Sequence, residues 1–116
     1  MPDLLKTKCV PCEGGIPPLT KDKEKMYLRR VEGWSLIIEG IHRIKKEFYF
    51  KDFKEAMKFV NKVADLAEEE GHHPDIYIYY DAVVLELHTH AIKGLHLNDF
   101  VMAAKINKIA EDKQIT

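Results

Sequence analysis

The chain has 116 residues, of which 46% are hydrophobic and 32% are charged, a size and composition typical of one globular domain. The 18 Lys and Arg residues balance 19 Asp and Glu residues, so no basic field favours nucleic acid or an anionic membrane as a partner. No apolar run approaches the roughly 20 residues of a membrane span, and Met1–Leu5 lacks the features of a signal peptide. We therefore expect a cytoplasmic protein that acts on small molecules or on other proteins.

Residues 1–19 are expected to form an irregular arm outside the core, followed by a single domain over residues 20–116. Four of the five prolines lie within the first 18 residues, and proline interrupts both helices and strands. The only thiols, Cys9 and Cys12, are too few for a disulfide framework. Their spacing is that of half a zinc site, but the sequence has no second CxxC pair to complete one.

The next predicted elements are a short helix and a β-hairpin. Lys21–Arg30 is a highly charged segment, and Thr20 is its candidate N-cap. Apolar residues then alternate in Trp34–Glu39 and in His42–Phe50, which predicts two strands that turn near Gly40.

The rest of the chain repeats the pattern of paired strands and helices. A capping box at Asp52 and an apolar stripe at helical spacing predict a helix that ends at Gly71. Two alternating strands and a last helical stripe follow, at Ile76–Tyr80, Val83–Leu87 and about Leu97–Asp112. The predicted fold class is therefore α+β: two layers, a four-stranded antiparallel sheet with helices on one face, in the order αββαββα.

The apolar alternation also predicts how the second hairpin pairs. A turn at Asp81 and Ala82 is expected to place six apolar side chains on the helix side, in the pairs Tyr80–Val83, Ile78–Leu85 and Ile76–Leu87. Continued outward, this register brings His73 opposite His90, with Cα atoms about 5 Å apart. His72 lies beside them, so we predict three imidazoles at the open end of the hairpin.

Three imidazoles this close would repel one another if they were protonated together, which favours function as the reason for the cluster. The preceding helix also ends in Glu68, Glu69 and Glu70, where the helix dipole disfavours carboxylates. Glu68 lies about one helical turn before His72 and could accept a hydrogen bond from its ring. The alternative interpretation is a solvated acidic helix end with surface histidines.

These residues resemble the signature of the pterin-4a-carbinolamine dehydratase family. The signature positions are Glu68, three residues, His72, His73, Pro74, five residues, Tyr80, nine residues, His90, eight residues and Asp99. The element order extends the resemblance from about Thr20 to Ile109, and the Cys9–Pro17 arm resembles that of bacterial members. One departure is His96, which stands where the family has a Ser or Thr cap for the last helix.

The resemblance implies dehydration of a 4a-hydroxytetrahydropterin to the quinonoid dihydropterin, a step in recycling the cofactor of aromatic amino acid hydroxylases. An acid must protonate the leaving hydroxide while a base takes a proton from the adjacent ring nitrogen. Imidazole, with a reference pKa of about 6.5, suits both tasks. No metal or redox cofactor is implied.

The resemblance also assigns site residues. It makes His72 and His90 the acid/base pair and His73 the residue that orients the pterin. Glu68 and Asp99 are supporting residues, although Asp99 could also be only a first-turn acid of its helix. The substrate-binding wall is expected to contain the three histidines together with Pro74, Thr89 and Ala91.

Other conspicuous side chains receive a plainer interpretation. His42 and His88 are expected to be partly exposed strand positions. Trp34, Tyr77 and Tyr79 are expected to lie in the core or at an interface.

Two further functions remain open. His72, His73 and His90 could be ligands of a metal-dependent hydrolase, but neighbouring strand residues point to opposite faces. Animal members of the family also act as dimerisation cofactors of a transcription factor, which makes an interaction module the second alternative. Family members form dimers or tetramers, and sheet edges need covering, so we expect a homodimer or homotetramer that binds a pterin.

Overall fold

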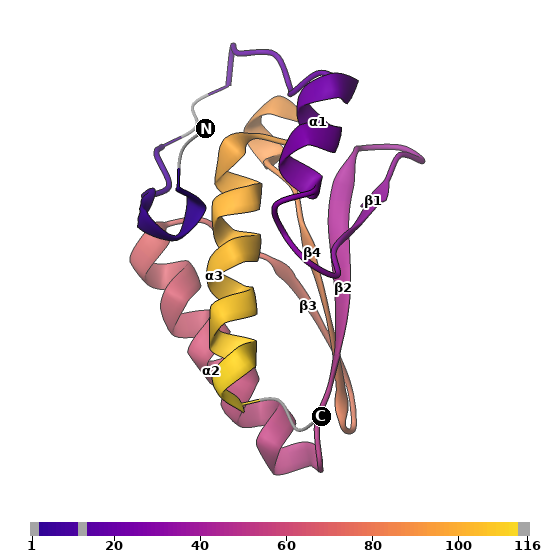
Figure 1. The fold of residues 1–116 in the computed structure, drawn as a ribbon, viewed down its shortest axis with the longest axis vertical. Coiled ribbons are helices and arrows are strands. Elements are labelled where there is room, and N and C mark those ends of the chain that lie inside the picture. Colours follow the sequence, from indigo (N-terminus) through magenta and orange to yellow (C-terminus); the bar gives the residue numbers. More distant parts are fainter. Residues whose placement is uncertain (1–2, 12–13, 114–116) are drawn as a thin grey trace.

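The structure is a computed structural model and describes residues 3–11 and 14–113. Within these residues, three α-helices cover one face of a four-stranded antiparallel sheet (Figure 1). The predicted α+β fold and its element order are confirmed. The elements are α1 (Lys21–Leu28), β1 (Ser35–Ile37), β2 (Arg43–Tyr49), α2 (Phe53–Glu70), β3 (Asp75–Tyr79), β4 (Ala82–Leu87) and α3 (Leu97–Lys113), with 3-10 helices η1 (Leu4–Lys6) and η2 (His90–Ile92).

Local side-chain chemistry sets the ends of the first two α-helices. The Thr20 hydroxyl accepts the Lys23 N–H at 3.3 Å, and the Asp52 carboxylate accepts the Glu55 N–H at 2.9 Å. Both are N-cap contacts, which satisfy donors that the helix itself leaves unpaired. α2 ends at Gly71, whose φ of 67° is left-handed and favours glycine. The predicted caps at both ends of α2 are therefore confirmed.

The sheet has the strand order β1-β2-β4-β3, so β1 and β3 are its edges. The predicted register between β3 and β4 is wrong by two residues. The chain turns at Tyr80 and Asp81 rather than at Asp81 and Ala82, because Tyr80 takes the left-handed conformation with φ 54°. The observed pairs are Asp75–Glu86, Ile76–Leu85, Tyr77–Val84, Ile78–Val83 and Tyr79–Ala82.

This shift changes which residues meet at the open end of the hairpin. In the observed register, an extension of the ladder past Asp75 leads His73 towards His88 rather than His90. Ile78 keeps the predicted helix-side face, because it pairs with the fully buried Val83, although it is 39% exposed on the edge strand β3. The prediction is wrong for Tyr80, which lies in the turn and is 68% exposed.

The hydrophobic core lies between the sheet and the helices. Its fully buried members include residues from β2, β4, α2 and α3, namely Ile44, Phe48, Val83, Leu85, Leu87, Phe59, Val63, Phe100 and Ile106. Trp34 is also buried, whereas Tyr77 and Tyr79 are exposed. The expectation that the arm stays outside the core is wrong at Leu4, which is only 4% exposed because η1 packs against α3 (Figure 1).

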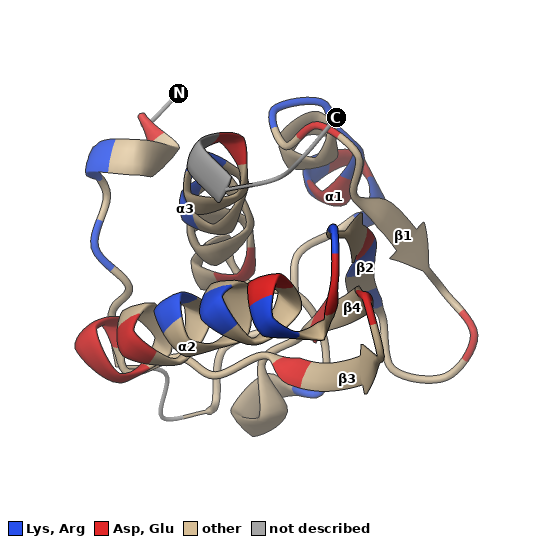
Figure 2. Cartoon of the chain, turned by 90° about the horizontal axis from the view of Figure 1, so that it is seen from below, with Lys and Arg blue, Asp and Glu red and all other residues tan. Residues whose placement is uncertain are grey.

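The charged side chains are spread over the surface, with one local concentration. Figure 2 shows acidic residues gathered where α2 ends, which corresponds to Glu68–Glu70. In the described ranges, every helix is too short or too polar to cross a bilayer. The acidic end of α2 lies next to the segment that carries His72 and His73.

Candidate active site

A cleft of about 360 Å³ opens where α2 ends, β4 ends and α3 begins. It is lined by the predicted site residues His72, His73, Pro74, Thr89, His90 and Ala91, together with Val10, Gly71, Asp75, His88 and Asn98. A larger hollow of about 440 Å³ beside Gly33 and Tyr49 has no histidine among its described lining residues. The cleft is therefore the place in the described structure where the predicted residues meet.

Two tight turns bring the histidines into the cleft. At the end of α2, the left-handed Gly71 redirects the chain, and the His72 N–H returns to the Ala67 carbonyl at 3.2 Å. After β4, the Thr89 N–H donates to the Gly94 carbonyl at 2.8 Å and closes the short turn that contains His90. Backbone hydrogen bonds therefore fix both of the turns that carry the histidines.

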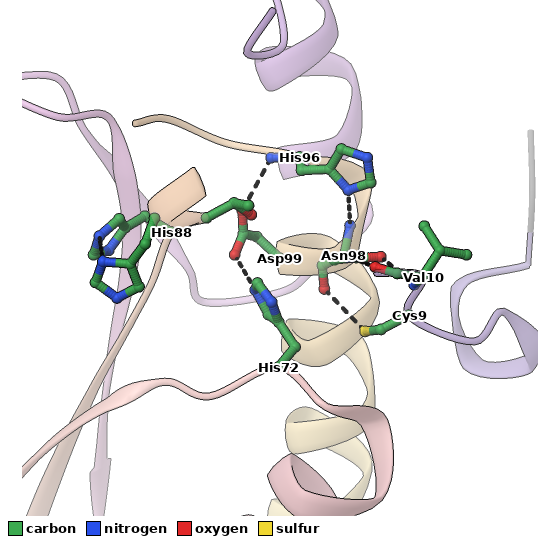
Figure 3. A network of polar contacts seen from close by, with 9 residues as sticks. Cys9, Val10, His72, His88, His96, Asn98 and Asp99 are labelled. Atoms are coloured by element: carbon green, nitrogen blue, oxygen red, sulfur yellow. Dashed lines mark hydrogen bonds and ion pairs between the residues drawn. The ribbon is translucent and has the colours of Figure 1, made fainter. Parts of the chain in front are cut away.

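His72 is held by the buried carboxylate of Asp99. Its Nε2 lies 2.6 Å from Asp99 Oδ1, and the two side chains are 11% and 0% exposed. Asp99 Oδ2 also accepts the Thr89 hydroxyl at 2.9 Å and the His96 N–H at 3.0 Å (Figure 3). Because Nε2–H donates to the carboxylate, Nδ1 is the nitrogen of the neutral His72 ring that can accept a proton.

Glu68 contacts His73 rather than His72, which corrects the predicted pairing. Its Oε2 lies 2.6 Å from His73 Nε2, and the side chains are 78% and 59% exposed. The prediction assumed that helical spacing continues to His72, but α2 ends at Glu70 and the chain turns at Gly71. A contact this exposed contributes little to stability.

His88 lies at the site, although the sequence did not predict it there. It is partly exposed, as expected, but it follows β4 by one residue and lines the cleft. Its Nε2 lies 3.2 Å from His90 Nδ1, and the ring centroids are 4.1 Å apart at an interplanar angle of 63°. The available signal was the spacing, since residues i and i+2 of an extended chain project to the same side.

Two residues of the cleft wall, Val10 and Asn98, were also missed. The Asn98 side chain accepts the Val10 N–H at 3.0 Å and donates to the Val10 carbonyl at 2.7 Å (Figure 3). The Glu70 carboxylate accepts the Cys9 N–H at 2.9 Å. These three hydrogen bonds fasten the N-terminal arm beside the cleft.

The departure from the family at His96 does not leave the start of α3 uncapped. His96 Nδ1 accepts the Asn98 N–H at 3.1 Å, while Asp99 accepts the His96 N–H in return. This reciprocal arrangement is a capping box in which an imidazole replaces the usual hydroxyl.

The cysteine and metal interpretations gain no support from the geometry. Burial and the nearby negative charge of Glu70 raise the pKa of Cys9 to about 12, so this side chain is a thiol and not a thiolate nucleophile at neutral pH. Cys12 lies outside the described residues. Over residues 3–11 and 14–113, no group of three His, Cys, Asp or Glu side chains is arranged to hold a metal ion.

Comparison with known protein sequences identifies the family. The family model described as pterin 4 alpha carbinolamine dehydratase matches residues 17–109. A relative from Azoarcus sp. (strain BH72) is 44% identical over 95% of this chain and 93% of its own length. A relative from Methylococcus capsulatus is 45% identical over 94% of this chain and 95% of its own length. Both are named "Putative pterin-4-alpha-carbinolamine dehydratase".

Solved structures show the same fold. A crystal structure from Brucella melitensis, described as a transcriptional coactivator/pterin dehydratase, superposes with a TM-score of 0.76 at 35% identity, over 80% of this chain and 98% of its own. A pterin dehydratase-like protein described as a RuBisCO assembly factor of the alpha-carboxysome has a TM-score of 0.59 over 68% of this chain and 90% of its own, and at 22% identity it shows the fold alone. The chain therefore belongs to the pterin-4a-carbinolamine dehydratase family.

Proposed function

We propose that this chain dehydrates a 4a-hydroxytetrahydropterin to the quinonoid dihydropterin and water, in the recycling of a tetrahydropterin cofactor. One observation carries the proposal. His72, His73 and His90 line one cleft, and a neighbouring side chain holds one ring nitrogen of each. Family membership supplies the substrate class.

The reaction needs one acid and one base in the same place. The bond between carbon 4a and its hydroxyl oxygen breaks, and the oxygen leaves as water after it receives a proton. The adjacent ring nitrogen forms the new C=N double bond and loses its proton to the base. No electrons are gained or lost, so the two proton transfers are the whole of the chemistry, and each positioned group contributes about 10²- to 10⁴-fold to the rate.

The proposed roles follow the arrangement of the side chains. His72 and His90 exchange the two protons, and His73 orients the pterin through hydrogen bonds. Asp99 holds His72 at a fixed orientation from within the protein, and Glu68 does the same for His73 from the surface. The remaining wall of the substrate site is assigned to Pro74, Thr89 and Ala91.

The test is a direct assay of carbinolamine dehydration with the wild-type chain and with His90→Ala. We expect the variant to keep the circular dichroism spectrum of the wild type, because His90 is exposed, and to lose at least about tenfold in kcat. His42→Gln is the matched control, since His42 lies outside the cleft and glutamine can still donate to its partner Glu24. A wild-type chain without activity, or a His90→Ala variant with full activity, would overturn the proposal.

We also propose that the chain works as a homodimer or homotetramer. The outer face of the sheet exposes three aromatic rings, Tyr49, Tyr77 and Tyr79, and β1 and β3 are open edges. Exposed apolar groups and unpaired strand edges favour association with a second copy. Sedimentation velocity measures the mass of the assembly, and a monomer at micromolar concentration would contradict this proposal.

A protein-interaction role is the second candidate function. The Brucella melitensis relative is described as a coactivator as well as a pterin dehydratase, and the same exposed tyrosines offer an apolar surface. The carbinolamine assay separates the two functions, because an interaction module needs no turnover.

A further inference from the structure

His88 forms a direct pair with a residue of the proposed acid/base machinery. Its Nε2 lies 3.2 Å from Nδ1 of His90, with the ring centroids 4.1 Å apart. We propose that His88 is a positioning residue, which holds Nδ1 of His90 and so leaves Nε2 as the nitrogen that exchanges a proton with the pterin. This inference rests on the proposed function and deepens it.

The backbone between the two histidines explains why their rings meet. Thr89 separates them, and its own side chain is only 4% exposed and donates to the buried Asp99. Thr89 also forms the β-bridge to Gly94 that fixes this turn. The residues on either side of Thr89 are thereby held in the same direction, into the cleft. The buried Asp99 carboxylate therefore has two contacts that matter here: it holds His72 directly, and through Thr89 it fixes the position of the His88–His90 pair.

The pair couples the hydrogens on the two rings. One of two neutral imidazoles must donate and the other must accept, because a ring nitrogen without a hydrogen cannot donate. The hydrogen bond therefore links the tautomer of His90 to that of His88 and fixes the orientation of the His90 ring. If both rings were protonated, two N–H groups would face each other and the bond would be lost, so the intact pair carries at most one positive charge.

His90 differs in this respect from the other two histidines of the cleft. His72 is held by Asp99 and His73 by Glu68, at 2.6 Å in each case. A carboxylate only accepts, and it stabilises a positive imidazole. An imidazole partner can either donate or accept, so His88 can follow a change in the hydrogen bonding of His90 during a proton transfer. This difference is consistent with His72 and His90 taking opposite parts in the reaction.

Two substitutions separate the hydrogen bond from the bulk of the ring. His88→Met keeps a side chain of comparable length but has no strong donor or acceptor. His88→Gln carries an amide that can restore either sense of the hydrogen bond. His88 is only partly buried, so we expect both variants to fold. We expect His88→Met to lose roughly tenfold in kcat with KM unchanged, and His88→Gln to recover most of that loss.

A second measurement needs no substrate. Long-range ¹H–¹⁵N correlation spectra report the protonation and the hydrogen bonding of each ring nitrogen of His90. We expect the Nδ1 shift of His90 to show a hydrogen bond in the wild type and in His88→Gln, and to lose it in His88→Met. Full kcat in His88→Met overturns the proposal, as does an unchanged Nδ1 shift of His90 or an equal loss of kcat in both variants.

The two measurements also separate this inference from the proposed function. A wild-type chain that does not dehydrate the pterin overturns the proposed function. The spectra then decide the role of His88 on their own, because a changed Nδ1 shift of His90 in His88→Met supports the positioning of His90 and an unchanged shift excludes it.

Discussion

Asp99 and His72 are 27 residues apart in sequence, yet the carboxylate oxygen of one lies 2.6 Å from the ring nitrogen of the other. The same carboxylate is fully buried and also accepts the Thr89 hydroxyl and the His96 N–H. One side chain therefore connects the segment after α2, the segment after β4 and the start of α3. Removing its charge tests both the chemistry and the construction of the cleft.

We expect Asp99→Asn to fold but to lose at least about tenfold in kcat. The asparagine oxygen can satisfy Thr89 and His96, and its NH₂ group would then face Nε2 of His72. This nitrogen would have to accept rather than donate, so the hydrogen on the His72 ring would move to Nδ1. We also expect a loss of about 1–3 kcal/mol in the free energy of unfolding, because a buried network is partly broken.

Steady-state kinetics and urea unfolding measure both effects. Asp65→Asn in α2 is the matched control, since it removes a carboxylate from an exposed position outside the cleft. Wild-type kcat in Asp99→Asn would show that His72 does not depend on this carboxylate.

The surroundings of Glu70 lead us to expect that the folded protein loses stability in acid. Burial would raise the pKa of its carboxyl, but the hydrogen bonds from the Lys105 ammonium at 2.7 Å and the Cys9 N–H at 2.9 Å, with the charges of Lys105 and Lys8, hold it below the ordinary value of 4.5. The folded pKa is thus lower than the unfolded one. The contribution of Glu70 to stability is therefore present above about pH 4.5 and is lost as the pH falls through the folded pKa.

Urea unfolding of the wild type and of Glu70→Gln, from about pH 3 to pH 7, measures this dependence. We expect the difference in unfolding free energy to be largest near neutrality and to shrink below about pH 4.5. The neighbouring Glu69 is exposed, and Glu69→Gln serves as the control. A difference that stays constant over the whole range would contradict the cited shift.

A side chain at position 94 would cause a steric conflict between the turn after β4 and the N-terminal arm. A Cβ at this position would lie 2.7 Å from Pro18 Cβ and 3.0 Å from Pro18 Cγ. The proline ring is rigid, and the adjacent Leu19 N–H is bonded to the Leu95 carbonyl at 2.9 Å, so neither side can yield freely. We expect Gly94→Ala to destabilise the chain by about 1–3 kcal/mol and to make the arm easier for a protease to cleave.

A double-mutant cycle with Pro18→Gly isolates this contact. Pro18→Gly removes the ring atoms that the added methyl group would meet, so we expect Gly94→Ala to cost less in that background than in the wild type. Additive losses of unfolding free energy would show that the contact is not the cause.

The helices and their caps could be predicted because their signals are local. Thr20, Asp52 and Gly71 act on backbone groups within a few residues of themselves. The extent of burial could not be predicted as well. Leu4 joins the core only because η1 folds back against α3, which no local pattern reports.

The register of the second hairpin shows a limit of periodicity. Side chains alternate with a period of two, so a slip of one residue is visible in the apolar pattern and a slip of two residues is not. Ile76 faces the same layer in both registers, and only its partner changes, from Leu87 to Leu85. The position of the turn decides between the two registers. The observed turn needs Tyr80 in the left-handed conformation, which is disfavoured for a tyrosine.

The residues of the candidate site could be collected from the sequence, but their contacts could not. The family signature contains His72, His73 and His90, and they line one cleft. Which carboxylate serves which histidine depends on the change of direction at Gly71, where helical spacing stops being a guide. His88 was overlooked because its role depends on a ring-to-ring contact.

The residues that line the cleft lie at one end of the protein. The β3–β4 turn at Tyr80 and Asp81 lies at the other end of the hairpin (Figure 1), and the six residues of β4 separate the two by about 20 Å. A fluorescent label or a surface linker attached at Asp81 would therefore stand clear of the histidines. Molecules immobilised through that turn would present their open clefts to the solution, ready for binding measurements on a sensor surface.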